Sequence, residues 1–168
     1  GQLYQQLNIE YLTPTVGLYI PGGDYFNFIR NLQTFETLNF EQVNADEEFP
    51  VGKTPYATLY FQHYESFDIA VKTFKRRYKR IIWDQIFIKI DFGKPCYTEN
   101  HIALWNDLKI PNSIAFFSPR VRSFWKYEIH NGVYVADWEI DGAKMFDISI
   151  LHFDLMEWLL NYKIVSIT

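Results

Sequence analysis

The sequence has little of several features that mark particular classes of protein. Its 168 residues include one cysteine, Cys96, so no disulfide forms within the chain, which predicts a cytoplasmic protein in a reducing compartment. No apolar run reaches the roughly 18 residues that a membrane span needs, and no signal peptide is visible. The net charge is −4 and basic residues form no extended run, which argues against nucleic acid as a partner.

Motifs that would identify a common reaction are also missing. Gly52-Lys53-Thr54 looks like the end of a phosphate-binding P-loop, but Glu47 stands where that motif needs a glycine. No G-x-G-x-x-G fingerprint, G-x-S-x-G elbow or D-x-D pair occurs, and no histidine has a partner at metal-ligand spacing. The sequence therefore predicts no metal site and leaves the cofactor unknown.

The composition is that of an ordinary globular protein, with 48% hydrophobic and 21% charged residues. The length suits one domain over residues 1–168. Aromatic residues reach 19%, and we expect most of them in the core. Tyrosine and tryptophan in loops would instead suit a carbohydrate surface, because their rings are flat and apolar with a polar edge.

Short apolar runs and helical patterns alternate along the chain. Strands are expected at Thr15–Ile20, Ala57–Gln62, Ile86–Ile90 and Ile114–Phe117, with a weak strand at Asn39–Val43. Helices are expected from Asp24, from Ser66 or Asp68, from Thr98 to about Leu108, and over Ile148–Asn161. The polar segment Asn44–Pro55 is expected to be a loop.

This alternation predicts an α/β fold, a layered domain with a largely parallel central sheet flanked by helices. Asn131-Gly132 and Asp141-Gly142 are typical hairpin turns, so an antiparallel edge is expected near residues 125–145. The chain opens on a helical stripe, so we also expect a strand upstream of residue 1.

Each expected central strand leads into residues that a core does not need. Gly22 and Gly23 follow the first, His63 and Tyr64 the second, Asp91 the third and Arg120 the fourth. Ligands bind beyond the carboxyl ends of parallel strands, so these residues are expected to share one site. The two glycines would bring backbone N–H groups close to an anion. They fit equally a tight turn in which Asp24 caps the helix.

His63, Tyr64 and Asp91 are the predicted catalytic residues. His63 would act as a general base, and Tyr64 and Asp91 would orient the acceptor. Asp68 lies five residues after His63, a spacing that some acyltransferases use. The alternative is that His63 only hydrogen-bonds a loop carbonyl. Cys96, near Lys94, is a weaker candidate nucleophile.

Arginines form the one dense cationic feature of the sequence. Arg77 and Arg80, together with Arg120, are predicted to bind a phosphate or carboxylate, because guanidinium groups pair with these anions through two bonds. The alternative is that the arginines near the end of the long helix stabilise its C-terminus.

Several segments together resemble one known family. The resemblance rests on T-P-T-V-G-L from Thr13, F-P-V-G from Phe49, H-Y from His63, R-x-x-R-I-x-x-D from Arg77, and F-D-x-x-x-W-L from Phe153. The chain is similar to the bacterial domain of unknown function 1919 (DUF1919), often labelled exopolysaccharide biosynthesis protein. The resemblance implies a role near surface polysaccharide assembly and a strand before residue 1, with Gly1 as the last glycine of its turn. It implies no catalytic residues.

Two functional hypotheses follow. The first is a transferase that modifies a sugar or a sugar-phosphate carrier. The alternative is a non-catalytic protein that binds a glycan or an anionic metabolite, in either case a small-molecule or carbohydrate ligand. A third interpretation is a stable domain whose polar residues only cap and bridge. A structure in which His63, Asp91, Arg120 and Arg77 faced one pocket would favour the first.

Overall fold

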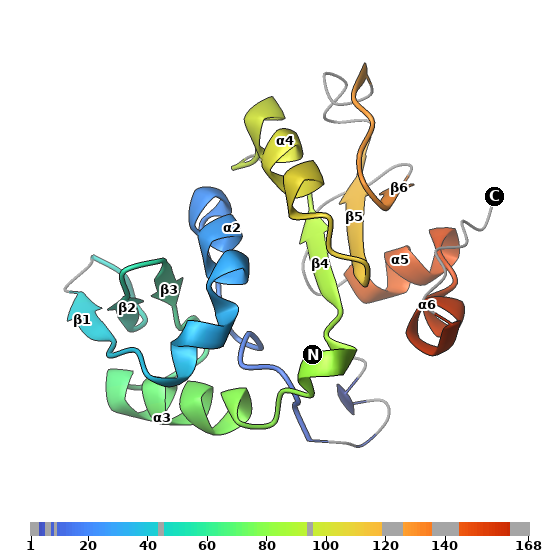
Figure 1. Ribbon diagram of the computed structural model, residues 1–168. Helices are drawn as coiled ribbons and strands as arrows, with labels where there is room; N and C mark the ends of the chain where they lie inside the picture. The colour runs from blue at the N-terminus through green and yellow to red at the C-terminus, as the bar shows by residue number, and fades with distance from the viewer. Residues whose placement is uncertain are drawn as a thin grey trace. The chain divides into compact units, whose positions relative to one another are not determined.

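The computed structural model describes residues 4–5, 8, 10–43, 46–93, 96–118, 126–135 and 145–161. The described part has a mixed α/β fold with five α-helices and two three-stranded sheets, so the predicted fold class is confirmed (Figure 1). The chain divides into two compact units, unit 1 (Gly1–Gln85) and unit 2 (Ile86–Thr168). Each unit is described by itself, and the single-domain assignment stays a prediction.

Unit 1 contains an antiparallel sheet in the order β1-β2-β3. Its strands are β1 (Glu41–Val43), β2 (Val51–Lys53) and β3 (Thr58–Tyr60). Its helices are α2 (Gly22–Arg30) and α3 (Phe67–Tyr78), with single 3₁₀ turns at Leu32–Glu36 and Trp83–Gln85. Figure 1 shows α3 running beneath the three strands.

Aromatic rings build the core of unit 1. Its main cluster of buried residues contains Phe28, Phe35, Ala57, Leu59, Phe61, Ala70, Phe74 and Tyr78. The α3 members recur at helical spacing, which turns one face of the helix onto the sheet. Tyr78 also donates its hydroxyl to the carbonyls of Leu32 (2.9 Å) and Gln33 (3.0 Å), so this buried polar group is satisfied. The expectation that aromatics gather in the core is met here.

Unit 2 contains a parallel sheet in the order β4-β5-β6. Its strands are β4 (Ile88–Asp91), β5 (Ser113–Phe117) and β6 (Gly132–Tyr134), and its helices are α4 (Glu99–Leu108), α5 (Met145–His152) and α6 (Leu155–Asn161). Figure 1 shows α4 on one side of β4 and β5, and α5 and α6 on the other. Its core contains Ile114, Phe116, Val133, Val135, Phe153 and Trp158.

The predicted strand at Thr15–Ile20 is wrong. Residues 14–17 form a turn, and Gly17 has a φ of 79°, which an extended strand does not allow. Tyr19 forms an isolated antiparallel bridge to Tyr60, outside any named strand. Conversely, β2 lies inside the segment predicted as a loop, where Pro50 and Pro55 flank it. Short strands bounded by prolines read as loops from local composition.

The end of unit 2 also differs from the prediction. Asn131 adopts a positive φ of 52° as a turn residue, but Gly132 then begins β6, which pairs with β5 in parallel rather than as a hairpin edge. The second predicted turn, Asp141-Gly142, lies outside the described residues. The predicted closing helix is split, because Asp154 Oδ1 accepts from the Glu157 N–H at 2.9 Å and starts a new helix.

Candidate functional site

The two glycines predicted to face an anion lie in the first turn of α2. Gly22 is buried and Gly23 is exposed. Asp24 does not cap this helix, and its Oδ2 instead accepts from the Thr58 N–H of β3 at 2.8 Å. This bond ties α2 to the sheet and places a carboxylate beside the helix end. The arrangement therefore favours a structural joint over an anion site.

Arg77 and Tyr64 meet in one network inside unit 1. Arg77 Nη1 donates to the Val16 carbonyl at 3.0 Å and to the Tyr64 hydroxyl at 2.8 Å. The Tyr64 hydroxyl donates to the same carbonyl at 3.3 Å. The guanidinium carbon of Arg77 lies 4.6 Å from the centre of the Tyr11 ring, within cation–π range. Arg77 and Tyr64 therefore bind the chain itself.

Arg80, which follows the C-terminus of α3, extends this network. It forms a salt bridge to Glu10 (3.0 Å) and donates to the Tyr11 carbonyl (3.4 Å). Together the two arginines hold residues 10–17 against α3. His63 is exposed, and its ring lies 3.6 Å from the point where a Cβ on Gly17 would be. Four predicted site residues thus lie in one neighbourhood, three of them engaged by internal contacts.

Asp91 lies in unit 2, at the carboxyl end of β4. It is 7% exposed, and its Oδ1 accepts from the Gly93 N–H at 2.9 Å. Ser118 follows β5 and is fully buried, and its Oγ has no hydrogen-bond partner among the described residues. Both side chains occupy the edge of a parallel sheet where ligands commonly bind. Arg120 and Lys94 lie outside the described residues, and the juxtaposition of His63 with Asp91 stays a prediction.

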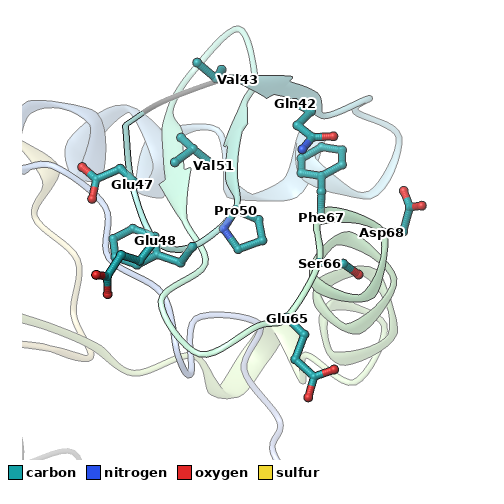
Figure 2. A pocket seen from close by; sticks show the side chains of 11 residues that line it. Gln42, Val43, Glu47, Glu48, Pro50, Val51, Glu65, Ser66, Phe67 and Asp68 are labelled. Carbon is teal, nitrogen blue, oxygen red and sulfur yellow. The ribbon is translucent and has the colours of Figure 1, made fainter.

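A pocket of about 480 Å³ opens in unit 1 beside β1, β2 and the start of α3 (Figure 2). The residues that line it are Gln42, Val43, Glu47, Glu48, Phe49, Pro50, Val51, Glu65, Ser66, Phe67 and Asp68. Apolar and aromatic groups thus alternate with hydrogen-bond acceptors around one opening. Most of the surface that lines the pocket is polar, and a smaller part is apolar.

The pocket carboxylates surround its mouth and do not converge. Figure 2 shows Glu47 and Glu48 on one side, Asp68 on the other and Glu65 projecting away below them. Within the described residues, no cluster of histidine, cysteine, aspartate and glutamate could hold a metal ion. The arrangement therefore suits an extended ligand.

Phe67 is held at this pocket by packing against other residues of unit 1. Its ring contacts Phe61 edge-on, with the ring centres 6.4 Å apart. A Cβ on Gly52 would lie 3.2 Å from the Phe67 ring, so the bare glycine of β2 makes room for it. Ser66 Oγ accepts from the Ile69 N–H at 3.4 Å and caps α3, which sets where Phe67 begins the helix.

Comparison with known proteins decides the family. The profile of the domain of unknown function 1919 matches residues 1–160. The chain belongs to the DUF1919 family. A relative described as an uncharacterized protein from Haemophilus influenzae is 26% identical over 114 residues, which cover 68% of this chain and 55% of the relative. The chain therefore spans about half the length of this curated relative.

Most of the segments on which the DUF1919 resemblance rests lie in unit 1 and meet there. The turn at Val16 and Gly17, the tyrosine of the H-Y pair and the first arginine of the R-x-x-R pattern form the network around Tyr64. The proline loop from Phe49 lines the pocket. Among the described residues of this DUF1919 chain, no helix is both long enough and apolar enough to cross a membrane.

The sequence reasoning missed the pocket of this DUF1919 protein. One local signal was available, because three consecutive acidic residues, Asp46 to Glu48, run directly into Phe49 and Pro50. What brings Glu65 and Phe67 to the same opening is the return of the chain from β3 into α3, which no local pattern reveals.

Proposed function

We propose that this DUF1919 protein binds a glycan in the pocket of unit 1. The observation that carries the proposal is the combination of apolar rings with hydrogen-bond acceptors around one opening. A sugar has an apolar C–H face that packs on a ring such as Phe67, and hydroxyls that donate to carboxylate and amide oxygens. Gln42 offers such an oxygen at the pocket.

The same observations favour a glycan over an anionic metabolite. Arg77 and Arg80, the groups predicted to bind a phosphate or carboxylate, contact residues 10–17 of the chain itself. Four of the eleven lining residues are acidic, and none of these described lining residues is basic. An anionic ligand would meet repulsion at this opening.

The setting of this binding is exopolysaccharide or capsule assembly, as the resemblance described above implies. We place the protein in the cytoplasm, because its one cysteine suits a reducing compartment. A protein that binds a glycan without transforming it would act there as an assembly or regulatory partner.

Calorimetric titration of the whole chain with a panel of neutral and amine-bearing oligosaccharides tests the proposal. We expect saturable binding by at least one oligosaccharide. Gln42→Ala should weaken it by roughly tenfold, since it removes a lining side chain. The control is Glu41→Ala, the exposed neighbour in β1 that does not line the pocket, which should bind as the unmodified chain does. No binding by any oligosaccharide, or equal loss in both variants, would contradict the proposal.

A second candidate, a transferase acting on a sugar or a sugar-phosphate carrier, is favoured by unit 2. Ser118 Oγ is buried without a hydrogen-bond partner among the described residues, and it lies at the carboxyl end of β5, the edge of a parallel sheet where ligands commonly bind. In such a reaction an acceptor hydroxyl would lose its proton to a general base, bond to the acyl or sugar carbon of the donor, and displace the thiol or nucleotide.

Turnover assays with acyl-CoA and nucleotide-sugar donors test the transferase. We expect a product in the whole chain and its loss in both His63→Ala and Asp91→Asn. Absence of turnover in the whole chain would contradict the transferase. Full activity in either variant would remove the substituted residue from the reaction.

A further inference from the structure

Two buried serines mark the two ends of β5. Ser113 begins the strand, Ser118 follows its last residue, and both are 0% exposed. The Ser113 hydroxyl donates to the Ile110 carbonyl at 2.6 Å, so the preceding turn satisfies it. The Ser118 hydroxyl has no hydrogen-bond partner among the described residues. Because a buried polar group without a partner is costly, Ser118 differs from Ser113 in a way that the described fold does not explain.

The pairing of β4 with β5 places a second polar group on the same face of the sheet. Asp91, the last residue of β4, lies opposite Phe116, and the Phe92 N–H donates to the Phe116 carbonyl at 2.8 Å. Side chains alternate between the two faces along a strand, so Ser118, two residues after Phe116, falls on the face that carries Asp91. Asp91 is 7% exposed, and its Oδ1 accepts from the Gly93 N–H at 2.9 Å. A buried carboxylate and a buried hydroxyl thus share one face at the carboxyl ends of adjacent parallel strands.

We infer that this end of the sheet binds a vicinal diol, the pair of adjacent hydroxyls that a ribose or a hexose carries. The diol site consists of Asp91 and Ser118. A carboxylate only accepts hydrogen bonds, whereas a serine hydroxyl both donates and accepts. One hydroxyl of a diol donates to Asp91 while its neighbour exchanges a hydrogen bond with Ser118, at the sheet edge where ligands bind in α/β proteins. The inference concerns binding in unit 2 and requires neither turnover nor the pocket of unit 1.

The same two side chains argue against other small ligands. A phosphate or carboxylate placed here would meet the carboxylate of Asp91 at short range and away from water, where like charges repel strongly. A metal ion needs several ligands, and within the described residues no three histidine, cysteine, aspartate or glutamate side chains gather. An apolar ligand would leave the Ser118 hydroxyl unpaired. A neutral ligand with two adjacent hydroxyls satisfies both groups.

Paired probes that differ by one hydroxyl test the inference on the whole chain. The nucleoside pair is uridine and 2′-deoxyuridine, and the hexose pair is methyl mannoside and its 2-deoxy analogue. We expect titration followed by NMR to show that the diol of one pair binds at least about fivefold more tightly than its deoxy partner, which leaves a buried group unpaired. The pair that responds identifies the source of the diol. Equal affinity within both pairs, or binding by no probe, would overturn the inference.

Serine-to-alanine variants at the two ends of β5 locate the effect. Ser118→Ala should remove the preference for the diol and leave the melting temperature of the chain without probe unchanged or higher, because no internal hydrogen bond is lost. Ser113→Ala is the matched control, which should lower the melting temperature, since the Ile110 carbonyl loses its donor, and keep the preference. A lower melting temperature in Ser118→Ala, or a preference that survives it, would assign that hydroxyl a structural role and overturn the inference.

A variant in unit 1 separates the diol site from the proposed glycan pocket. Gln42→Ala removes a side chain that lines the pocket and should leave the preference for the diol unchanged. Loss of the preference in Gln42→Ala and its survival in Ser118→Ala would overturn the diol site and leave the glycan pocket standing. The reverse result, together with no oligosaccharide binding, would support the diol site and contradict the pocket.

Discussion

The guanidinium of Arg77 joins parts of the chain that are far apart in sequence. It contacts the Val16 carbonyl, 61 residues away, the Tyr64 hydroxyl and the face of Tyr11. Only arginine combines a planar fork of donors with a surface that stacks on a ring. The same chemistry that predicts an anion ligand therefore also serves a backbone carbonyl and two tyrosines.

Replacing Arg77 with lysine is expected to lower the free energy of unfolding by about 1–3 kcal/mol, because an ammonium cannot stack its plane on the Tyr11 ring while it donates to Val16 and Tyr64. Urea denaturation measures the change. The control is Arg76→Lys, which alters an exposed neighbour on α3 and should change stability by less than about 0.5 kcal/mol. Unchanged stability in Arg77→Lys, with loss of an anionic ligand, would restore the ligand-binding interpretation.

Gly52 and Gly23 form a natural pair for comparing glycines. A Cβ on Gly52 would lie 3.0 Å from the Phe61 ring and 3.2 Å from the Phe67 ring, whereas a Cβ on Gly23 would have no neighbour within 4 Å. Packing leaves no space for a side chain at Gly52. Gly23 lies in the helix α2 and has space for one.

We expect Gly52→Ala to destabilise the protein by about 1–3 kcal/mol through overpacking, and to weaken glycan binding because Phe67 must move. Gly23→Ala should stabilise it by about 0.5–1 kcal/mol, since alanine favours the helix. Thermal and urea denaturation of both variants check the signs. Equal effects of the two substitutions would contradict the packing argument.

Among the helices, α4 begins with an unusual capping box. The Thr98 N–H donates to Nδ1 of His101 at 2.8 Å, in the place where glutamate or glutamine normally accepts. Only a neutral imidazole offers that nitrogen as an acceptor. Partial burial lowers the pKa of His101 below its ordinary value of about 6.5.

The start of α4 is therefore expected to weaken in acid. The unfolded chain binds a proton at His101 more readily than the folded chain, so the stabilising contribution is present above pH about 6.5 and is lost as the pH falls through the folded pKa. His101→Gln keeps an acceptor that does not titrate. Thermal denaturation at pH 7.5 and 5.5 should show a smaller acid loss in this variant than in the unmodified chain. Identical losses would contradict a titrating cap.

Local signals predicted some elements well and others badly. The helices α3 and α4 begin after Ser66 and Thr98, as expected, because a cap acts on backbone groups within one turn. Thr15–Ile20 fails as a strand because Gly17 bends the chain to bring Val16 to Arg77. The turn pair Asn131-Gly132 suggested a hairpin when it was considered alone. The strand β6 instead pairs in parallel with β5, which ends at Phe117, and this distant partner is not visible in the local sequence.

At the scale of the molecule, each unit has a cluster of buried side chains among its described residues. The cluster of unit 1 is built from residues 28 to 78 and that of unit 2 from residues 114 to 158. Leu59 is a fully buried member of the first cluster, and Ile114 is a fully buried member of the second.

Leu59→Ala and Ile114→Ala should each lower the free energy of unfolding by about 2–5 kcal/mol, because each leaves a cavity. Hydrogen exchange should place the largest loss of protection in unit 1 for the first variant and in unit 2 for the second. The same pattern of lost protection in both variants would argue against separate cores.

The chain order of residues is enough to specify caps, helical faces and the α/β class, because those depend on neighbours within a turn or on periodic burial. Which partner each polar side chain contacts depends on folding. Arg77 reaches Val16, and the loop from Glu47 meets Phe67, only after distant segments pack together. Charge and hydrogen bonding act over a few ångströms, so which groups satisfy one another is settled by packing in three dimensions.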